Sequence, residues 1–520
     1  MGRPKGAPLR APLARAATVT AVLAAVACGW QLRFGRAHLG AFVNYDAAGI
    51  TYNAEAILRG ELPYRDVAEM KPPGPFVIAA AVLATAGRSL HALAVAANLW
   101  MIAAGLVLFD LARRLYGAGP ALLALALFSV YTPNLDKIDF NYETWLALPY
   151  VASAYFAWRA AKTGAPWHFA ASGACATAAG LMRHQGVFGL AVPLAMALCA
   201  APRGRRAAWV IAGAITGGGP LLVWYAAHGA TGELVRGLVL SEWGWRYVGD
   251  IPFAEKIART REGLGGALQY LGIPLVLAAS SAMGGLLVPH QVGRRALFVV
   301  VWLAASFAGT AVGFRFYQSY YMQLAAPLIL AAAHPAGPIG ALFAGSWVTL
   351  RRRAIWALAA LTLAAAAPVA RADYKTAIRQ QHARRRPRDG TPARIGRAIR
   401  RATRPGDPIF CWGRHAWAVY WYSARHSPSP IYKATGVLTT PNTDSLRRPS
   451  RPIRFLPSPQ ADAFLRTMRE TPPAWLVLDG SPWRTWPAFR QLVRDGYQRD
   501  ARLSRPGIDV YRRTSLPARR

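Results

Sequence analysis

Long apolar runs recur along most of this 520-residue chain, and they constrain its fold more than any other feature. A helix needs about 20 mainly apolar residues to cross the hydrocarbon core of a bilayer. Runs of this kind recur between residues 17 and 370, and 54% of all residues are hydrophobic. The sequence therefore predicts a mainly α-helical, polytopic membrane protein.

Eleven of these runs are predicted to cross the membrane. They lie at 17–33, 90–112, 118–133, 144–160, 168–182, 187–201, 207–227, 266–288, 296–313, 320–335 and 354–370. The apolar run 76–86 is too short to cross at about 1.5 Å per helical residue, so we expect a short helix along the outer interface. Residues 336–350 are interpreted as an interfacial or re-entrant segment.

The basic residues predict the orientation of these spans. The formal net charge is +37, but its arginines are dispersed over short loops such as 113–114, 203–206, 294–295 and 351–353. Such loops lie in the cytoplasm by the positive-inside rule, which places the N-terminus inside and the C-terminus outside. A nucleic-acid-binding protein would instead gather its basic residues on one face. We therefore expect a multi-pass protein of the inner (plasma) membrane and no nucleic-acid partner.

The composition changes after residue 371. Short apolar stretches at 408–413 and 474–478 are typical of strands, and the segments 459–470 and 485–495 are typical of helices. A region of about 140 residues is an ordinary domain size. The chain is therefore predicted to consist of a transmembrane domain, 1–371, and a soluble α/β domain, 372–520, on the outer side.

A polar loop at 44–75 follows the first predicted span and holds two candidate site residues. Asp46 lies at the outer membrane boundary, where a carboxylate can accept a proton from a hydroxyl. The structural alternative is an N-cap for a helix over 47–58. Lys71 precedes two prolines that fix the backbone, so its ammonium can be aimed at a phosphate. Its alternative role is that of a lysine extending to the lipid interface.

Other candidates lie at the outer ends of later spans. Arg183 and Arg315 stand out there against the positive-inside trend, and together with Lys71 they are candidates for binding the phosphate of a lipid carrier. In the second outer loop, Asp139 and Glu143 could orient an acceptor, hold a divalent cation through oxygen ligands, or be hydrated loop residues. The spacing of His and Cys supports no structural zinc site.

Several short motifs follow one another along most of the chain. They are Asp46-x5-Tyr52-x-Ala54, Gly60-x-Leu62-Pro63-Tyr64-Arg65-Asp66, Lys71-Pro72-Pro73, Asn141-x-Glu143, Arg183-x-Gln185, Tyr320-Tyr321-x-Gln323-Leu324-x-x-Pro327 and Pro405-Gly406-Asp407-x-Ile409-Phe410-x-Trp412-Gly413. This ordered set resembles the polytopic glycosyltransferases of the GT-C fold, in the family-39-like group that includes protein mannosyltransferases and aminoarabinose transferases. Each motif is weak alone, but their order is fairly specific.

The resemblance implies an inverting sugar transfer from a polyprenyl-phosphate donor to a hydroxyl of a lipid, glycan or protein. Asp46 would be the catalytic base, and Lys71, Arg183 and Arg315 would bind the donor phosphate. Phosphate is a good leaving group, so no second carboxyl acid is needed. The further candidates are Asp66, Asp139, Asn141 and Glu143 for an acceptor or a metal, and Tyr52, Tyr64, Gln185, Tyr320 and Tyr321 as supporting residues. No cofactor is certain, and a divalent cation is left open.

The sequence also departs from the family pattern and leaves other functions open. Many relatives have Glu after the first Asp, where this chain has Ala47, and the late motif often has His where this chain has Ser319. A transporter or flippase would also have many spans and a basic charge. It would, however, carry charges in mid-membrane and an internal repeat, neither of which this sequence shows. A noncatalytic scaffold that binds the carrier lipid is a third alternative.

Overall fold

The computed structural model describes residues 18–27, 29–30, 42, 45–135, 140–199, 202–241, 251–286, 293–337, 339, 371, 390–480 and 482–514. The chain divides into two compact units. Unit 1 comprises Met1–Ala37, Ala94–Pro220 and Thr260–Arg385, and unit 2 comprises His38–Leu93, Leu221–Arg259 and Arg386–Arg520. Each unit is therefore assembled from three separate stretches of sequence.

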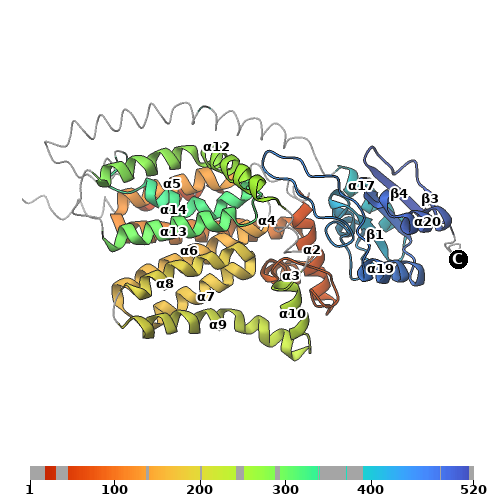
Figure 1. Ribbon diagram of the computed structural model, residues 1–520, viewed down its shortest axis with the longest axis horizontal. Coiled ribbons are helices and arrows are strands. Elements are labelled where there is room, and N and C mark those ends of the chain that lie inside the picture. The colour runs from red at the N-terminus through yellow and green to blue at the C-terminus, as the bar shows by residue number, and fades with distance from the viewer. Residues whose placement is uncertain are drawn as a thin grey trace, which may run out of the picture. The chain divides into compact units, whose positions relative to one another are not determined.

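Unit 1 is a bundle of apolar helices, and its helices α5, α6, α7, α13 and α14 lie side by side in Figure 1. Its elements are α4 (Leu90–Tyr116), α5 (Ala118–Leu135), α6 (Tyr142–Thr163), α7 (Pro166–Met182), η1 (His184–Leu190), α8 (Ala191–Leu198), α9 (Arg203–Ala227), α12 (Phe253–Leu286), α13 (Arg294–Ala311), η3 (Gln318–Tyr321) and α14 (Met322–Ala332). The first residues of α4 and α12 and the last residues of α9 belong to unit 2. In the described part of the chain, α4, α5, α9, α12 and α13 are long and apolar enough to cross a membrane.

The helices follow the predicted spans closely. Each predicted span between 90 and 335 corresponds to a helix, although 187–201 consists of η1 followed by α8, and 320–335 consists of η3 followed by α14. Residues 18–27 of the first predicted span are helical. The predicted span 354–370 and most of 336–350 lie outside the described residues. The short run 76–86 forms α3 (Gly74–Ala86), a helix of 13 residues.

Helices α7 and α9 pack so closely that only glycine fits at several positions of their contact. A Cβ at Gly213 would lie 1.8 Å from the carbonyl oxygen of Ala170, and one at Gly173 would lie 2.0 Å from that of Val210. Gly217, one turn after Gly213, meets α7 in the same way. Small residues four apart are the usual means of bringing helix backbones into contact inside a membrane.

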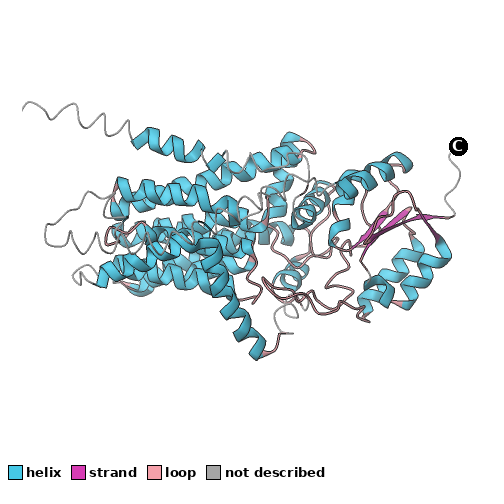
Figure 2. Cartoon of the chain, turned by 90° about the horizontal axis from the view of Figure 1, so that it is seen from above, coloured by secondary structure: helices cyan, strands magenta, loops and turns pink. Residues whose placement is uncertain are grey.

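Unit 2 contains a four-stranded sheet, drawn in magenta in Figure 2. Its strands are β1 (Ile409–Trp412), β2 (Trp475–Asp479), β3 (Tyr497–Arg499) and β4 (Ile508–Arg513), in the order β1-β2-β4-β3. β1 and β2 are parallel, with Ile409 opposite Trp475, and the other pairs are antiparallel. The two predicted strands are confirmed as β1 and β2, whereas β3 and β4 were not predicted.

Helices cover both faces of this sheet. Phe410 of β1 packs on one face against α19 (Pro459–Glu470) and α20 (Pro487–Gly496), which match the two predicted helices. Ile409 packs on the other face, with α17 (Gly390–Ala402), α18 (Ala418–Ser423) and α2 (Tyr45–Leu58). Burial on both faces explains why the strand sequences are continuous apolar runs. Helix α2, which carries Asp46, therefore packs on one face of this sheet.

Candidate active site

The side chains of Asp46 and Lys71 form an ion pair. Lys71 Nζ lies 2.6 Å from Asp46 Oδ1, and the two side chains are 31% and 29% exposed. Helix α2 begins at Tyr45, so Asp46 lies within its first turn and is not an N-cap. A carboxylate is favourable at that position because the helix dipole is positive there. The pair combines a carboxylate that can accept a proton with an ammonium that can bind a phosphate, and both side chains are accessible to water.

The loop before Lys71 is held by Tyr64. Its hydroxyl donates a hydrogen bond to the backbone carbonyl of Lys71 at 2.7 Å. The backbone of Tyr64 has a φ of 70°, an uncommon left-handed conformation for a residue with a Cβ. Gly237 in α10 (Thr231–Leu238) leaves room for the ring, since a Cβ there would lie 2.2 Å from a ring carbon of Tyr64. Tyr64 thus holds the backbone of Lys71 in place.

A buried carboxylate, Glu69, fixes the other side of this loop. It forms an ion pair with Lys433, and its side chain is fully buried. Its oxygens also accept hydrogen bonds from the Tyr432 hydroxyl at 3.0 Å and from Asn53 Nδ2 at 3.2 Å. The backbone N–H groups of residues 70 and 71 donate to it at 2.8 and 3.2 Å. Glu69 therefore joins the loop, α2 and the segment around residue 432 in one network.

The network also determines the charge of Glu69. Burial alone would raise the pKa of its carboxyl, but the ammonium groups of Lys433 and Lys71 and the hydrogen bonds outweigh burial and hold that pKa below its ordinary value. Sequence analysis missed this group of residues. Glu69 lies between two of the motifs that were identified, so its position was a usable signal, whereas nothing in the local sequence pointed to Lys433.

Tyr52 has a packing role. Its ring stacks on Tyr432 with centroids 4.1 Å apart and an interplanar angle of 10°. Its hydroxyl accepts a hydrogen bond from the backbone N–H of Ser427 at 3.1 Å. Burial raises the pKa of Tyr52 well above its ordinary value, so the phenol stays protonated. Tyr52 therefore supports the site by joining α2 to the segment around residue 427.

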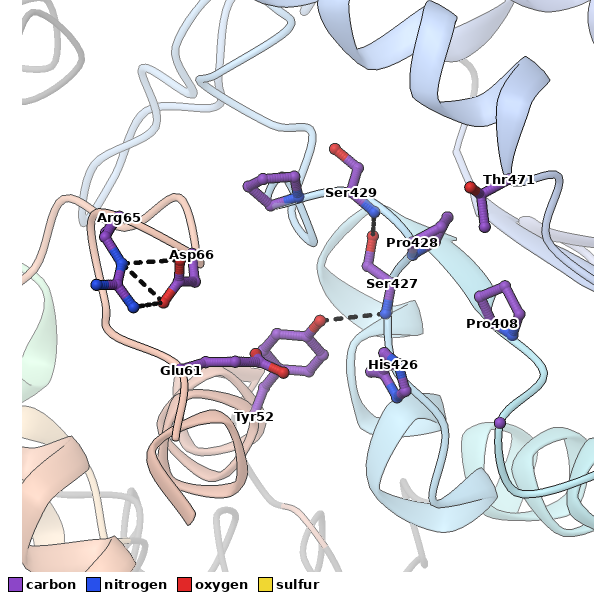
Figure 3. A pocket seen from close by; sticks show the side chains of 12 residues that line it. Tyr52, Glu61, Arg65, Asp66, Pro408, His426, Ser427, Pro428, Ser429 and Thr471 are labelled. Atoms are coloured by element: carbon purple, nitrogen blue, oxygen red, sulfur yellow. Dashed lines mark hydrogen bonds and ion pairs between the residues drawn. The ribbon is translucent and has the colours of Figure 1, made fainter. Parts of the chain in front are cut away.

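A polar cavity of about 470 Å³ lies beside this contact (Figure 3). Its wall includes Glu61, Asp66, His426 and Ser427. Asp66 accepts a hydrogen bond from the backbone N–H of residue 62 at 2.8 Å and pairs with Arg65 at 2.7 Å, which lowers the pKa of Asp66. Burial lowers the pKa of His426. Asp66 thus closes its own turn and faces a cavity lined by neutral and charged polar groups.

A second cluster lies in unit 1 and is centred on Glu143. Its Oε1 pairs with Arg183 and accepts a hydrogen bond from the Ser319 hydroxyl at 3.0 Å. Arg183 also donates to Gln185, and its guanidinium carbon lies 4.1 Å from the ring centroid of Tyr320. Four predicted residues from three distant parts of the sequence therefore meet here. Ser319, which departs from the motif pattern, contacts the cluster through its hydroxyl.

Glu143 is buried at the start of α6. Asn141 is the N-cap of this helix, because its side chain accepts a hydrogen bond from the backbone N–H of residue 142 at 2.8 Å. Glu143 is 1% exposed, and its Oε2 has no hydrogen-bond partner among the described residues. This oxygen is therefore able to accept a further hydrogen bond.

Arg315 and Tyr321 are buried residues of unit 1 that lie close to each other in the sequence. Arg315 is 0% exposed and lies between Phe314 and Phe316, each with a φ of 50°. Phe316 packs over Gly263, where a Cβ would lie 2.3 Å from its ring. The hydroxyl of Tyr321 donates to the carbonyl of Gly263 at 2.7 Å, so Tyr321 has a structural role.

Asp46 and Lys71 thus pair in unit 2, whereas the contacts within unit 1 join four other predicted residues, namely Glu143, Arg183, Gln185 and Tyr320. Asp139 lies outside the described residues, as do its neighbours 136–138. Within the ranges that the structure describes, no three His, Cys, Asp or Glu side chains gather in a way that could hold a metal ion.

Residues 70–227 match the family described as dolichyl-phosphate-mannose-protein mannosyltransferase. None of the curated protein sequences matches the chain.

Solved structures show a similarity that extends over nearly the whole chain. ArnT from Cupriavidus metallidurans in the apo state has 16% sequence identity and a TM-score of 0.59, and the match covers 96% of this chain and 98% of ArnT. The same protein bound to undecaprenyl phosphate matches with 16% identity and a TM-score of 0.57, over 95% of this chain and 97% of ArnT.

A third match is the archaeal oligosaccharyltransferase AglB from Archaeoglobus fulgidus, in complex with an inhibitory peptide and a dolichol-phosphate. It has 12% identity and a TM-score of 0.52, over 96% of this chain and 75% of AglB. Similarity at such low identity establishes the fold. The chain is therefore a polytopic membrane protein with the GT-C fold of membrane glycosyltransferases, and residues 70–227 match the mannosyltransferase family named above.

Proposed function

We propose that this chain transfers a sugar from a polyprenyl-phosphate donor to a hydroxyl of an acceptor, with inversion at the anomeric carbon. The observation that carries the proposal is the 2.6 Å pair of Asp46 and Lys71 on a chain with the GT-C fold. The related ArnT structure contains undecaprenyl phosphate and the related AglB structure contains a dolichol-phosphate, which supports a lipid-phosphate donor here.

In the proposed reaction the acceptor oxygen attacks the anomeric carbon in a single displacement. The carboxylate of Asp46 accepts the hydroxyl proton, and the bond between the anomeric carbon and the phosphate oxygen breaks, leaving its electron pair on the phosphate. Lys71 stabilises that phosphate as a positive point charge. Because Lys71 is paired with Asp46 before substrate binds, a bound phosphate would compete for the ammonium and free the carboxylate for proton transfer.

The residues of unit 1 are proposed to take the following roles, which their contacts support. Arg183 is a donor-phosphate ligand whose guanidinium is oriented by Glu143, Gln185 and Tyr320, and Arg315 is proposed for the same phosphate. The free oxygen of Glu143 is proposed to contact the acceptor. We assign no step to a divalent cation. The reaction is placed at the outer face of the inner membrane, with a cytoplasmic N-terminus and the C-terminal domain outside.

The test uses the full chain in liposomes, supplied with a polyprenyl-phosphate sugar and a panel of hydroxyl acceptors. Asp46→Asn should lower the release of polyprenyl phosphate by about a hundredfold or more, the usual contribution of a general base. Glu233→Gln is the matched control, because Glu233 is 31% exposed and also pairs with a cation, Arg236. Turnover of Asp46→Asn equal to that of the control would exclude Asp46 as the base.

A further inference from the structure

The end of strand β1 packs directly on the end of β2. Gly413 follows β1 with a φ of 91°, a left-handed conformation that favours glycine. A Cβ at this position would lie 2.7 Å from the Cβ of Asp479, the last residue of β2. This close approach explains the glycine at the end of the last sequence motif, and it brings His415 beside Asp479.

Asp479 fixes the orientation of the His415 imidazole. Its Oδ2 accepts a hydrogen bond from the backbone N–H of His415 at 2.9 Å, and it also lies 2.9 Å from His415 Nδ1. Nδ1 therefore carries its hydrogen toward the carboxylate, and Nε2, on the opposite side of the ring, faces away from Asp479. The His415 side chain is 69% exposed and that of Asp479 only 15%. An oriented imidazole is thus presented to water.

This imidazole lies next to the start of α2. Its ring meets that of Tyr45 edge to face, with centroids 5.7 Å apart, and the guanidinium carbon of Arg414 lies 5.3 Å from the centroid of the same ring. Tyr45 directly precedes Asp46. Two basic side chains therefore lie where the N–H groups and the dipole of α2 also favour negative charge. The carboxyl ends of parallel strands, which supply both side chains, are a common place for ligand binding.

We propose that Arg414 and His415, together with the start of α2, form an oxyanion-binding subsite beside Asp46. The ligand is a phosphate or carboxylate group of a substrate. This inference rests on the proposed function for the identity of the molecule that carries the anion. Two sources share this chemistry, namely the phosphate of the donor and an acidic group on the acceptor.

The subsite responds to pH because its affinity depends on the charge of His415. The hydrogen bond to Asp479 raises the pKa of His415 above its ordinary value, and the charge of Asp479 adds to this effect, while burial and Arg414 oppose it. Among the described residues, the titratable groups in contact with the imidazole or acting on it are Asp479 of β2, Arg414 of its own turn and the phenol of Tyr45 in α2. Anion binding is therefore strongest while the imidazole is protonated and weakens as pH rises through the folded-state pKa.

The test uses the full chain in nanodiscs with sulfate as the probe, because sulfate stays a dianion over the whole tested pH range whereas inorganic phosphate titrates within it. Sulfate binding is followed by thermal stabilisation, which requires no turnover, so it remains readable when every sugar donor fails. The wild-type affinity should fall about threefold to fivefold between pH about 6 and about 8, as expected for an exposed charge pair. His415→Gln should bind sulfate weakly at both pH values, and Asp479→Asn should move the transition to lower pH.

Asp509→Asn is the matched control and should retain the wild-type profile, because Asp509 is also 15% exposed and lies in the same sheet. Turnover then identifies the source of the anion. A higher KM for the acceptor alone in His415→Gln assigns the anion to the acceptor, and a higher KM for the donor alone assigns it to the donor. Sulfate binding that is independent of pH in the wild type, or unchanged in His415→Gln, would overturn the proposal.

Discussion

Replacing Glu69 by Gln should release the loop that carries Lys71. The substitution keeps the shape of the side chain but leaves the Lys433 ammonium, whose side chain is only 8% exposed, without its buried counter-charge. Removing one partner of a buried ion pair costs about 3–5 kcal/mol. We expect the lower end of that range, because the amide oxygen of Gln can still accept hydrogen bonds from the backbone N–H groups of residues 70 and 71.

Hydrogen–deuterium exchange of those two backbone amides in the full chain in nanodiscs measures the effect. A loss of about 3 kcal/mol corresponds to about a hundredfold faster exchange, since each factor of ten is about 1.4 kcal/mol. Glu61→Gln is the control, because its pair with Arg59 is 34% exposed on both sides and should be worth less than about 1 kcal/mol.

A double variant, Glu69→Gln with Lys433→Met, tests the physical reason. It removes the uncompensated charge, so much of the protection of the two amides should return. The reasoning fails if Glu69→Gln exchanges no faster than Glu61→Gln. It also fails if the double variant exchanges as fast as the single one, because the cost would then not arise from an unpaired Lys433.

Two further predictions concern the packing of the candidate site. Ser319→Ala removes the hydroxyl that donates to Glu143 at 3.0 Å, and the loss of about 1 kcal/mol should raise the KM for the donor about threefold to tenfold. Ser319→Thr keeps the hydroxyl and should behave as wild type. Gly237→Ala places a methyl group 2.2 Å from the ring of Tyr64 and should lower the thermal unfolding midpoint through an overpacking cost of about 1–3 kcal/mol. A midpoint equal to that of Gly232→Ala, whose nearest contact would be 3.8 Å, would contradict this.

The helices and the first two strands could be predicted because each carries its own signal. A span is a long apolar run, and a strand buried on both faces, such as β1, is a short one. The strand β4 lacks such a signal, since only one of its six residues is buried and it ends in two arginines. The short strand β3 has two exposed residues. These two strands depend on pairing with distant residues, which local composition does not show.

The candidate site could be predicted only as separate residues. The motifs singled out Asp46 and Lys71, 25 positions apart, and the structure pairs them. They also singled out Arg183 and Glu143, which form an ion pair. The partner of Glu69, by contrast, is 364 positions away in the sequence, so only the folded chain brings its ammonium to the loop.

The glycine contacts between α7 and α9 restrict the paths open to a lipid-borne substrate. The backbones touch at Gly173 and Gly213, where even a methyl group would collide with a carbonyl oxygen. An isoprenoid tail, such as that of the proposed donor, is wider than a methyl group, so it cannot pass between the two helices at this contact. Lateral entry of such a donor from the bilayer therefore has to use a gap other than this contact between α7 and α9.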